Sequence, residues 1–176
     1  MGRTQRFTKN KILNTAYDLF NESGCKDLKI RSIAKACHSS VYPIYSLFIS
    51  QKELYDAVID LAFHRLKIYL ETFIPLYSTS KIGTNLQFAR AIQKTPGIVK
   101  EVNQGNMEII NRLVAVAEPF FSEIPELRDP KRLEVHLVLI ISVISAYKAS
   151  NNTLTSFDFN EIMKDMSTYL EPKISI

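Results

Sequence analysis

The stretch IRSIAKACHSSVYPIYSLF, residues 30–48, predicts two short helices joined by a turn. Apolar residues recur in it at intervals of three and four, the spacing that places side chains on one face of a helix. The first set comprises Ile30, Ile33, Ala34 and Cys37, and the second comprises Val41, Ile44, Tyr45 and Phe48. Two short helices connected in this way form a helix-turn-helix.

Pro43 lies inside the second of these helices, where a proline can break the structure. With Ser40 as the N-cap, Pro43 becomes the third helical residue, and N–H groups of the first turn have no partner within the helix. The proline therefore removes no hydrogen bond, although it disfavours the α conformation at Tyr42. The turn falls on His38 and Ser39. Glycine is the easiest residue where such a turn needs a positive φ, and histidine is a permitted occupant.

Outside this stretch, the chain shows further helical periods and neither a strand pattern nor an internal repeat. The expected helices cover residues 8–23, 51–74, 96–118, 130–149 and 157–171. Gly24 ends the first of them, Pro75 ends the second, and a segment without a period follows at residues 75–85. Gly105 weakens the middle of the third, and Pro119 stops or kinks it. The predicted fold class is all-α, with about eight or nine helices.

The charge of the chain is unevenly distributed. Residues 1–51 carry eight basic and three acidic side chains, whereas residues 52–176 carry 14 basic and 15 acidic ones. A basic amino-terminal part joined to a near-neutral remainder is typical of a nucleic-acid-binding module fused to a second module, although a solvated basic face without a partner gives the same pattern. We therefore expect a DNA-binding helix-turn-helix domain at residues 1–50 and a second helical domain at residues 51–176.

Several other classes of protein are disfavoured by the sequence. The longest apolar run, residues 137–146, is too short to span a bilayer, and the amino terminus lacks the apolar segment of a secretory signal. We therefore expect a cytoplasmic protein that makes no membrane contact. Cys25 and Cys37 show neither disulfide nor metal-ligand spacing. The sequence has no phosphate-binding loop, nucleophile motif or metal motif, so we expect neither an enzyme nor a cofactor or metal site.

Residues 11–54, KILNTAYDLFNESGCKDLKIRSIAKACHSSVYPIYSLFISQKEL, resemble the amino-terminal domain of tetracycline-repressor-type (TetR/AcrR) transcriptional regulators. In that family a first helix of the form IL.AA..LF...G is followed by the pattern IA..AGVS...LY.YF.SKE.L. The residues that match, in register and without gaps, are Ile12, Leu13, Ala16, Leu19, Phe20, Gly24, Ile33, Ala34, Ala36, Ser40, Tyr45, Phe48, Ser50 and Leu54. The resemblance implies a ligand-responsive repressor that binds a palindromic double-stranded DNA operator as a homodimer.

The resemblance also implies roles for individual residues of the amino-terminal domain. In similar proteins the residue at Tyr45 contacts a phosphate, whereas the alternative here is a plain packing tyrosine. Gln51 stands where the family usually has a lysine, so either Lys52 takes over that phosphate contact or the contact is weaker. Val41 either reads a base or belongs partly to the core. The full set of candidate DNA-binding residues is Lys29, Arg31, Ser40, Val41, Tyr42, Pro43, Tyr45, Ser46 and Lys52.

The residues expected to read bases depart chemically from the family pattern. Val41, Tyr42 and Pro43 offer one hydroxyl group where lysine, glycine and threonine are common. Hydrogen-bonded readout should therefore be sparse, so that thymine methyl contacts and DNA shape carry more of the specificity. Together with His38 and Gln51, these departures leave open an alternative function, a helical effector-binding or protein-interaction module with lost or weak DNA binding.

For residues 51–176 the resemblance implies an unknown small apolar or amphipathic effector bound between helices. The residues that could line its pocket, each of which is also explained as ordinary core, are Phe63, Leu66, Phe88, Met107, Ile110, Phe120, His136 and Tyr147. His136 either orients a polar group of the ligand or is a hydrogen-bonded structural histidine.

The helices expected at residues 130–149 and 157–171 are more apolar than a surface helix needs to be. Pairing them with the same helices of a second copy would form a four-helix bundle. The residues expected in this dimer interface are Leu133, Leu137, Ile141, Ile144, Phe159, Ile162 and Met166.

Overall fold

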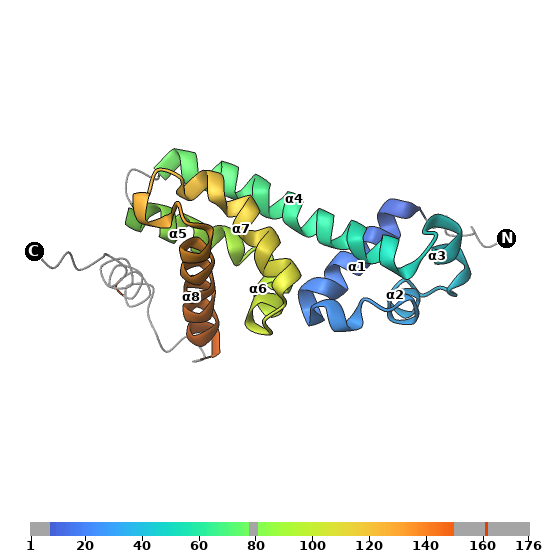
Figure 1. Ribbon diagram of the computed structural model, residues 1–176. Helices are drawn as coiled ribbons and strands as arrows, with labels where there is room; N and C mark the ends of the chain where they lie inside the picture. Colours follow the sequence, from blue (N-terminus) through green and yellow to red (C-terminus); the bar gives the residue numbers. More distant parts are fainter. Residues whose placement is uncertain (1–7, 78–80, 150–160, 162–176) are drawn as a thin grey trace, which may run out of the picture.

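The computed structural model describes residues 8–77, 81–149 and 161, and every regular element within these ranges is helical. The elements are α1 (Lys9–Ser23), η1 (Cys25–Asp27), α2 (Ile30–Ala36), α3 (Tyr42–Leu47), α4 (Gln51–Tyr77), α5 (Lys81–Ile92), α6 (Pro96–Asn103), α7 (Met107–Phe121), η2 (Pro125–Leu127) and α8 (Pro130–Ala149). Figure 1 shows an elongated arrangement with α1, α2 and α3 at one end and α5 to α8 at the other. The all-α prediction is confirmed.

Helix α1 begins and ends close to the predicted residues. The Thr8 hydroxyl accepts a hydrogen bond from the backbone N–H of Lys11 (3.2 Å) and so caps the first turn. At the other end, Gly24 has a φ of 74° and donates its N–H to the carbonyl of Phe20 (2.8 Å). The buried face of α1 comprises Ile12, Ala16, Tyr17 and Phe20.

The prediction that Pro75 ends the long helix was wrong, because α4 continues to Tyr77. The buried Leu70 and Ile74 hold this part of α4 in the core, and this packing outweighs the cost of the proline. The segment at residues 75–85, which shows no helical period in the sequence, includes the start of α5. Sequence periodicity missed α5 because three of its buried residues are polar: Thr84, Asn85 and Gln87.

The single helix expected at residues 96–118 is two helices, α6 and α7. Gly105, with a φ of 73°, interrupts the helix between them. The side chain of Asn106 then caps α7 by accepting a hydrogen bond from the N–H of Ile109 (3.4 Å). Pro119 lies inside α7, close to its end at Phe121, and does not stop it. The helix expected at residues 157–171 lies, apart from Glu161, outside the described residues.

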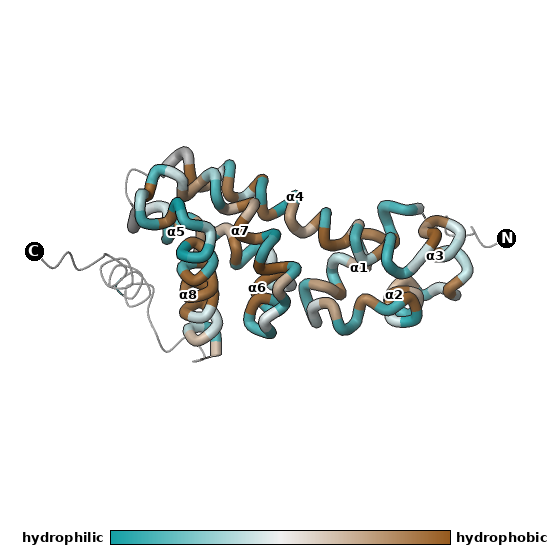
Figure 2. Tube along the Cα trace, in the orientation of Figure 1, coloured by the Kyte–Doolittle hydropathy of each residue, from teal (hydrophilic) through white to brown (hydrophobic). Residues whose placement is uncertain are grey.

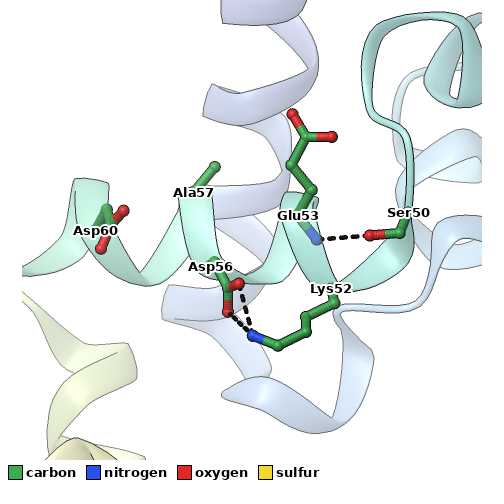
Figure 3. A pocket seen from close by; sticks show the side chains of 6 residues that line it. All are labelled: Ser50, Lys52, Glu53, Asp56, Ala57 and Asp60. Carbon is green, nitrogen blue, oxygen red and sulfur yellow. Dashed lines mark hydrogen bonds and ion pairs between the residues drawn. The ribbon is translucent and has the colours of Figure 1, made fainter.

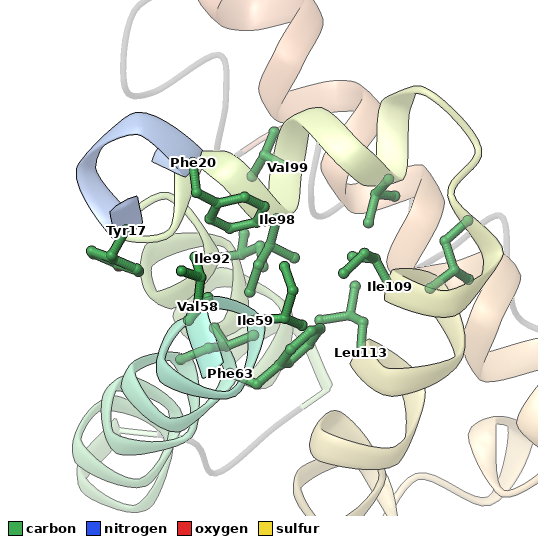
Figure 4. Close-up of a cluster of buried hydrophobic side chains, with 14 of the residues drawn as sticks. Tyr17, Phe20, Val58, Ile59, Phe63, Ile92, Ile98, Val99, Ile109 and Leu113 are labelled. Atoms are coloured by element: carbon green, nitrogen blue, oxygen red, sulfur yellow. The ribbon is translucent and has the colours of Figure 1, made fainter. Parts of the chain in front are cut away.

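One continuous hydrophobic core joins the amino-terminal helices to the rest of the chain. Figure 4 shows side chains from α1, α4, α5, α6 and α7 gathered together, among them Tyr17, Phe20, Ile59, Ile98 and Leu113. Helix α4 packs against α1 as well as against α5 and α7, and Figure 2 shows hydrophobic positions recurring along its length. The predicted domain boundary at residues 50 and 51 therefore falls beside a helix that is common to both parts, and that boundary stays a prediction.

Candidate functional site

The turn between α2 and α3 is a hydrogen-bonded stop for α2. His38 has a φ of 51°, in the left-handed region. Its N–H donates to the carbonyl of Lys35 (3.0 Å), and the N–H of Ser39 donates to the carbonyl of Ala34 (2.9 Å). This pair of bonds around a left-handed residue is the Schellman motif, which satisfies the last carbonyls of a helix. The interpretation of His38 as the occupant of a positive-φ turn is confirmed.

Helix α3 begins one residue later than predicted. The carbonyl of Val41 accepts the first helical hydrogen bonds, from the N–H groups of Ile44 (3.1 Å) and Tyr45 (3.2 Å). Val41 is therefore the N-cap and no side chain caps this turn, so the prediction that Ser40 is the N-cap was wrong. Pro43 becomes the second helical residue and still lies in the first turn, where its missing N–H removes no hydrogen bond.

The two faces of α3 have different environments. Ile44 is fully buried, and Phe48, just after the helix, is also buried. Facing solvent are Val41, Tyr42 and Tyr45, which are 38%, 79% and 56% exposed. Both tyrosines are thus accessible to a partner, and the structure does not bury Val41 in the core. Burial of one side of α3 leaves its other side as an apolar and aromatic surface.

The remaining candidate DNA-binding residues divide into accessible and engaged groups. Lys29 and Arg31, at the start of α2, and Ser40, before α3, are exposed, and Pro43 is half-buried. Ser46 is exposed, but its hydroxyl donates to the carbonyl of Pro43 (2.8 Å). The groups at the start of α4 are engaged: they are Lys52, whose Nζ pairs with the Asp56 carboxylate (2.7 Å), and Gln51, whose Nε2 donates to the carbonyl of Leu28 (3.4 Å).

The surface around α2 and α3 is basic. Residues 28–52 contain no aspartate or glutamate, and Lys29, Arg31 and Lys35 are all exposed. The pKa of Lys52 is raised by its hydrogen bond to Asp56 and by the charge of that carboxylate, so its ammonium group stays charged. Cations with few nearby anions are suited to binding an anionic polymer such as DNA.

Ile49, in the link between α3 and α4, is a surface residue that the sequence interpretation missed. Its side chain is 93% exposed, yet its N–H donates to Oε2 of Glu53 (2.7 Å). The hydroxyl of Ser50 accepts the N–H of Glu53 (3.0 Å), and Oε1 of Glu53 pairs with Lys9 (3.2 Å). These bonds resemble a capping box, whose signature, serine followed three residues later by glutamate, is readable in the sequence. The sequence therefore did contain a signal for Ile49, namely an apolar residue directly before this signature.

A shallow hollow of about 390 Å³ lies along the first three turns of α4 (Figure 3). Five of its six lining residues are polar or charged, and the full set is Ser50, Lys52, Glu53, Asp56, Ala57 and Asp60. The Asp60 carboxylate also forms an ion pair with Arg112 of α7. The hollow differs in position and chemistry from the apolar effector pocket expected between helices.

The residues expected to line an effector pocket do not all lie in one place. Phe63, Leu66, Phe88, Ile110 and His136 are buried, and Phe120 and Tyr147 are half-buried. Met107, at the first position of α7, is 51% exposed and belongs to the surface.

Three buried rings of this region, from α5, α7 and α8, pack edge to face. The rings of Phe88 and Phe121 are 5.7 Å apart between centroids, and those of Phe121 and His136 are 5.8 Å apart. Nε2 of His136 lies 2.7 Å from Oδ1 of Asn85, so His136 is hydrogen-bonded within the core. Asn85 was not among the residues predicted for the pocket. Because α5 was not predicted as a helix, the burial of Asn85 in it could not be predicted either.

Four of the residues expected in the dimer interface are buried within the single chain. They are Leu133, Leu137, Ile141 and Ile144, and their face of α8 belongs to the hydrophobic core. The apolar side chains that α8 turns outward are instead Val135 and Leu139, which are 56% and 40% exposed. The other three expected residues, Phe159, Ile162 and Met166, lie outside the described residues.

Helix α6 is bonded to the end of α1 through a buried carboxylate. Oε1 of Glu101 accepts the N–H of Cys25 (2.7 Å), and Oε2 accepts from the side-chain amide of Asn106 (2.7 Å). Nζ of Lys100 donates to the carbonyls of Asn21 (3.1 Å) and Glu22. Partial burial raises the pKa of the Cys25 thiol to about 12, so this thiol stays protonated at neutral pH.

The same junction requires close approach of the two helices. The N–H of Gly97 donates to Oδ1 of Asn21 (3.2 Å), and a Cβ at Gly97 would lie 2.4 Å from the Phe20 ring. We therefore expect a displacement of α6 to displace the end of α1 as well.

Comparison of the chain with models of known protein families and with curated proteins found no match. Within residues 8–77 and 81–149, no helix is long and apolar enough to cross a membrane. The same part of the chain has no cluster of three or more histidine, cysteine or acidic side chains placed to hold a metal ion.

Proposed function

We propose that the chain is a DNA-binding transcriptional regulator of the tetracycline-repressor type, a ligand-responsive repressor that binds a palindromic operator as a homodimer. The observation that carries the proposal is the α2–turn–α3 unit. Its second helix buries Ile44 and exposes Tyr42 and Tyr45. In a helix-turn-helix, the second helix enters the major groove and its first residues contact base edges. The basic surface of residues 28–52 complements the phosphate backbone on either side of the groove.

The proposal is tested by a gel-shift titration with the DNA beside the chain's own gene, repeated at several salt concentrations and followed by footprinting. We expect a discrete footprint and an affinity that falls steeply with salt, because phosphate contacts release counterions. A second titration uses the double variant Lys29→Ala/Arg31→Ala. It should weaken binding and lower the salt slope by about one for each phosphate that the variant no longer neutralises.

The matched control is Lys131→Ala/Arg132→Ala, which removes the same charge from exposed positions at the start of α8. If the protein gives no footprint at low salt, or if both double variants reduce the slope equally, DNA binding by the helix-turn-helix is refuted.

Control by an effector is the second part of the proposal. The region between α5, α7 and α8 combines aromatic rings with the buried polar pair Asn85 and His136, the composition expected of a site for a small amphipathic molecule. The bonds from α6 to α1 would transmit a shift of the bundle to the DNA-binding end, through a differential affinity of the effector for two states. Native mass spectrometry of the purified chain should reveal a bound small molecule, and adding that molecule should weaken operator binding. A molecule that binds without changing operator affinity would contradict this part.

A specific observation favours the alternative function, in which DNA binding is weak or lost. The two side chains at the start of α4 that could approach phosphate are both engaged, Lys52 with Asp56 and Gln51 with the carbonyl of Leu28. An exposed ion pair of this kind is worth little, so DNA can displace Asp56 from Lys52. The gel-shift titration separates the two functions, since a module without DNA binding leaves the DNA unshifted at every salt concentration.

A further inference from the structure

The exposed side chains of residues 41–49 form an unusual surface for a DNA-binding helix. We define the apolar patch as Val41, Tyr42, Tyr45 and Ile49, four large side chains between 38% and 93% exposed. Within the same stretch, Ile44 and Phe48 are buried and supply the hydrophobic core, so the four exposed side chains are not needed there. Scattered apolar side chains on a surface need no explanation, but four exposed ones within nine residues make this surface a candidate for contact with a partner.

The polar groups available on α3 are few. The helix, YPIYSL, has no arginine, lysine, asparagine, glutamine or acidic residue. Paired hydrogen bonds from arginine or lysine to guanine, and from asparagine or glutamine to adenine, cannot therefore come from this helix. The Ser46 hydroxyl already donates to the carbonyl of Pro43 (2.8 Å). The side-chain donors of α3 that remain are the hydroxyl groups of Tyr42 and Tyr45.

Ile49 extends the patch beyond α3 on a fixed piece of backbone. Its N–H is held by Glu53, whose carboxylate is bonded to Lys9 as well. Phe48, the preceding residue, is buried, and the Lys9 ammonium lies 4.8 Å from the centre of its ring. The Ile49 side chain is thus presented to solvent from a rigid link, which reduces the entropy lost when a partner covers it.

The charges around the apolar patch decide what covers it. No acidic residue occurs between residues 28 and 52, whereas Lys29, Arg31 and Lys35 are exposed there. The Glu53 carboxylate, which is bonded to Ile49, is paired with the ammonium group of Lys9. This charge distribution complements DNA. In the major groove, the apolar group that DNA presents to such a patch is the C5 methyl of thymine.

We propose that the apolar patch recognises thymine methyl groups, so that each operator half-site carries A·T pairs whose methyl groups face Val41, Tyr42 and Ile49. This inference rests on the proposed DNA-binding function and adds the class of sequence that is bound. The phosphate contacts position the protein, and the methyl contacts supply the specificity.

The test starts with selection of a binding site from random double-stranded DNA by the full chain. Each thymine of the selected site is then replaced in turn by deoxyuridine, which removes the methyl group and leaves every hydrogen-bonding atom in place. We expect at least one thymine in each half-site at which the replacement raises Kd about fourfold, the effect of one buried methyl group. Deoxyuridine in the flanking DNA should have no effect.

Variants then assign the methyl groups to side chains. In Tyr42→Ala and in Ile49→Ser, replacing the thymine read by the missing side chain should no longer raise Kd. Ile68→Ser is the matched control, since Ile68 is an exposed apolar residue of α4 outside the patch. Circular dichroism of each variant checks that the helices are retained.

The results separate failure of the inference from failure of the proposed function. A selected site that is bound with a footprint, but is insensitive to every deoxyuridine, overturns methyl recognition and leaves DNA binding standing. If no site is selected and no salt-dependent gel shift is seen, methyl recognition and DNA binding are both overturned. If Tyr42→Ala and Ile49→Ser change the mass of the protein in solution and leave Kd unchanged, the patch is a protein interface, and methyl recognition is wrong. The deoxyuridine series on the unmodified protein decides the matter even if a variant fails to fold.

Discussion

His38 occupies a backbone position that glycine fills at little energetic cost. Its φ of 51° and the bonds of the following residue direct the chain from α2 toward α3. A β-branched side chain is strained in this region, so we expect His38→Val to lower the free energy of unfolding by about 1–2 kcal/mol. His38→Gly should stay within about 1 kcal/mol of the original, because relief of strain is offset by a more flexible unfolded chain. Urea unfolding of the three proteins measures the difference, and equal stability of the valine and glycine variants would contradict the assignment.

Glu53 makes the link between α3 and α4 sensitive to acid. The N–H of Ile49, and then the ammonium of Lys9, hold the pKa of its carboxyl below the usual value. Because the pKa is lower in the folded state, the stabilisation is complete above about pH 5 and is lost as the pH falls through the folded-state pKa. The Tm difference between the original protein and Glu53→Gln should therefore shrink from pH 6 to pH 3. Glu118→Gln, at an exposed position of α7, is the control, and the prediction fails if the two variants show the same pH dependence.

At the scale of the elements, the buried carboxylate of Glu101 contributes to the contact of α6 with the end of α1. Glu101→Ala would leave the Cys25 N–H and the Asn106 amide without their acceptor, which costs about 1–3 kcal/mol for each buried group left unsatisfied. We expect Glu101→Ala to lower the free energy of unfolding by at least about 1 kcal/mol, measured by urea unfolding. Glu118→Ala should change it by less than about 0.5 kcal/mol, because surface substitutions seldom matter. Similar values for the two variants would show that the Glu101 carboxylate contributes nothing to stability.

The elements also differ in how far they could be predicted. Helices α1, α2 and α3 follow from the sequence within a residue or two, because each has one apolar face and a recognisable end such as Gly24. Helix α5 was missed because Thr84, Asn85 and Gln87 are buried polar residues, and burial that depends on tertiary hydrogen bonds leaves no apolar period.

The break between α6 and α7 shows a second kind of limit. Gly105 was recognised as a weak point, but the cap from Asn106, directly after it, and the bond of Asn106 to Glu101 were not, although both residues lie within five positions of the glycine. For the candidate site, the basic residues and the tyrosines of α3 could be predicted. The exposure of Ile49 was missed, although the capping-box signature of Ser50 and Glu53 directly after it was readable in the sequence.

At the scale of the whole molecule, α4 connects the helix-turn-helix with the carboxy-terminal helices without an interruption. Its first turn is bonded to the link after α3, and its later turns pack against α5 and α7. A second connection runs from α6 to the end of α1. Because two connections lead to one small unit, we expect the helix-turn-helix to reorient only together with a movement of α4 relative to α6.

The proposed homodimer requires a surface that the single chain leaves open, and the described part of α8 offers one. Val135 and Leu139 are four residues apart, so they lie on one exposed face of that helix, opposite the buried Leu137 and Ile141. A symmetric pair of such faces would bury both side chains twice. We expect the protein to have twice the 20.1 kDa mass of one chain by light scattering, and Val135→Lys/Leu139→Lys to have the mass of one chain.

The control for this experiment is Ile68→Lys/Ala115→Lys, which adds the same two charges at exposed positions of α4 and α7. It should keep the mass of the original protein. A dimer that survives the α8 substitutions would place the interface elsewhere. If the α8 variant is monomeric, it should also bind an operator with two half-sites more weakly than the original protein does. Its affinity for a single half-site should be unchanged, because only the link between the two helix-turn-helix units is lost.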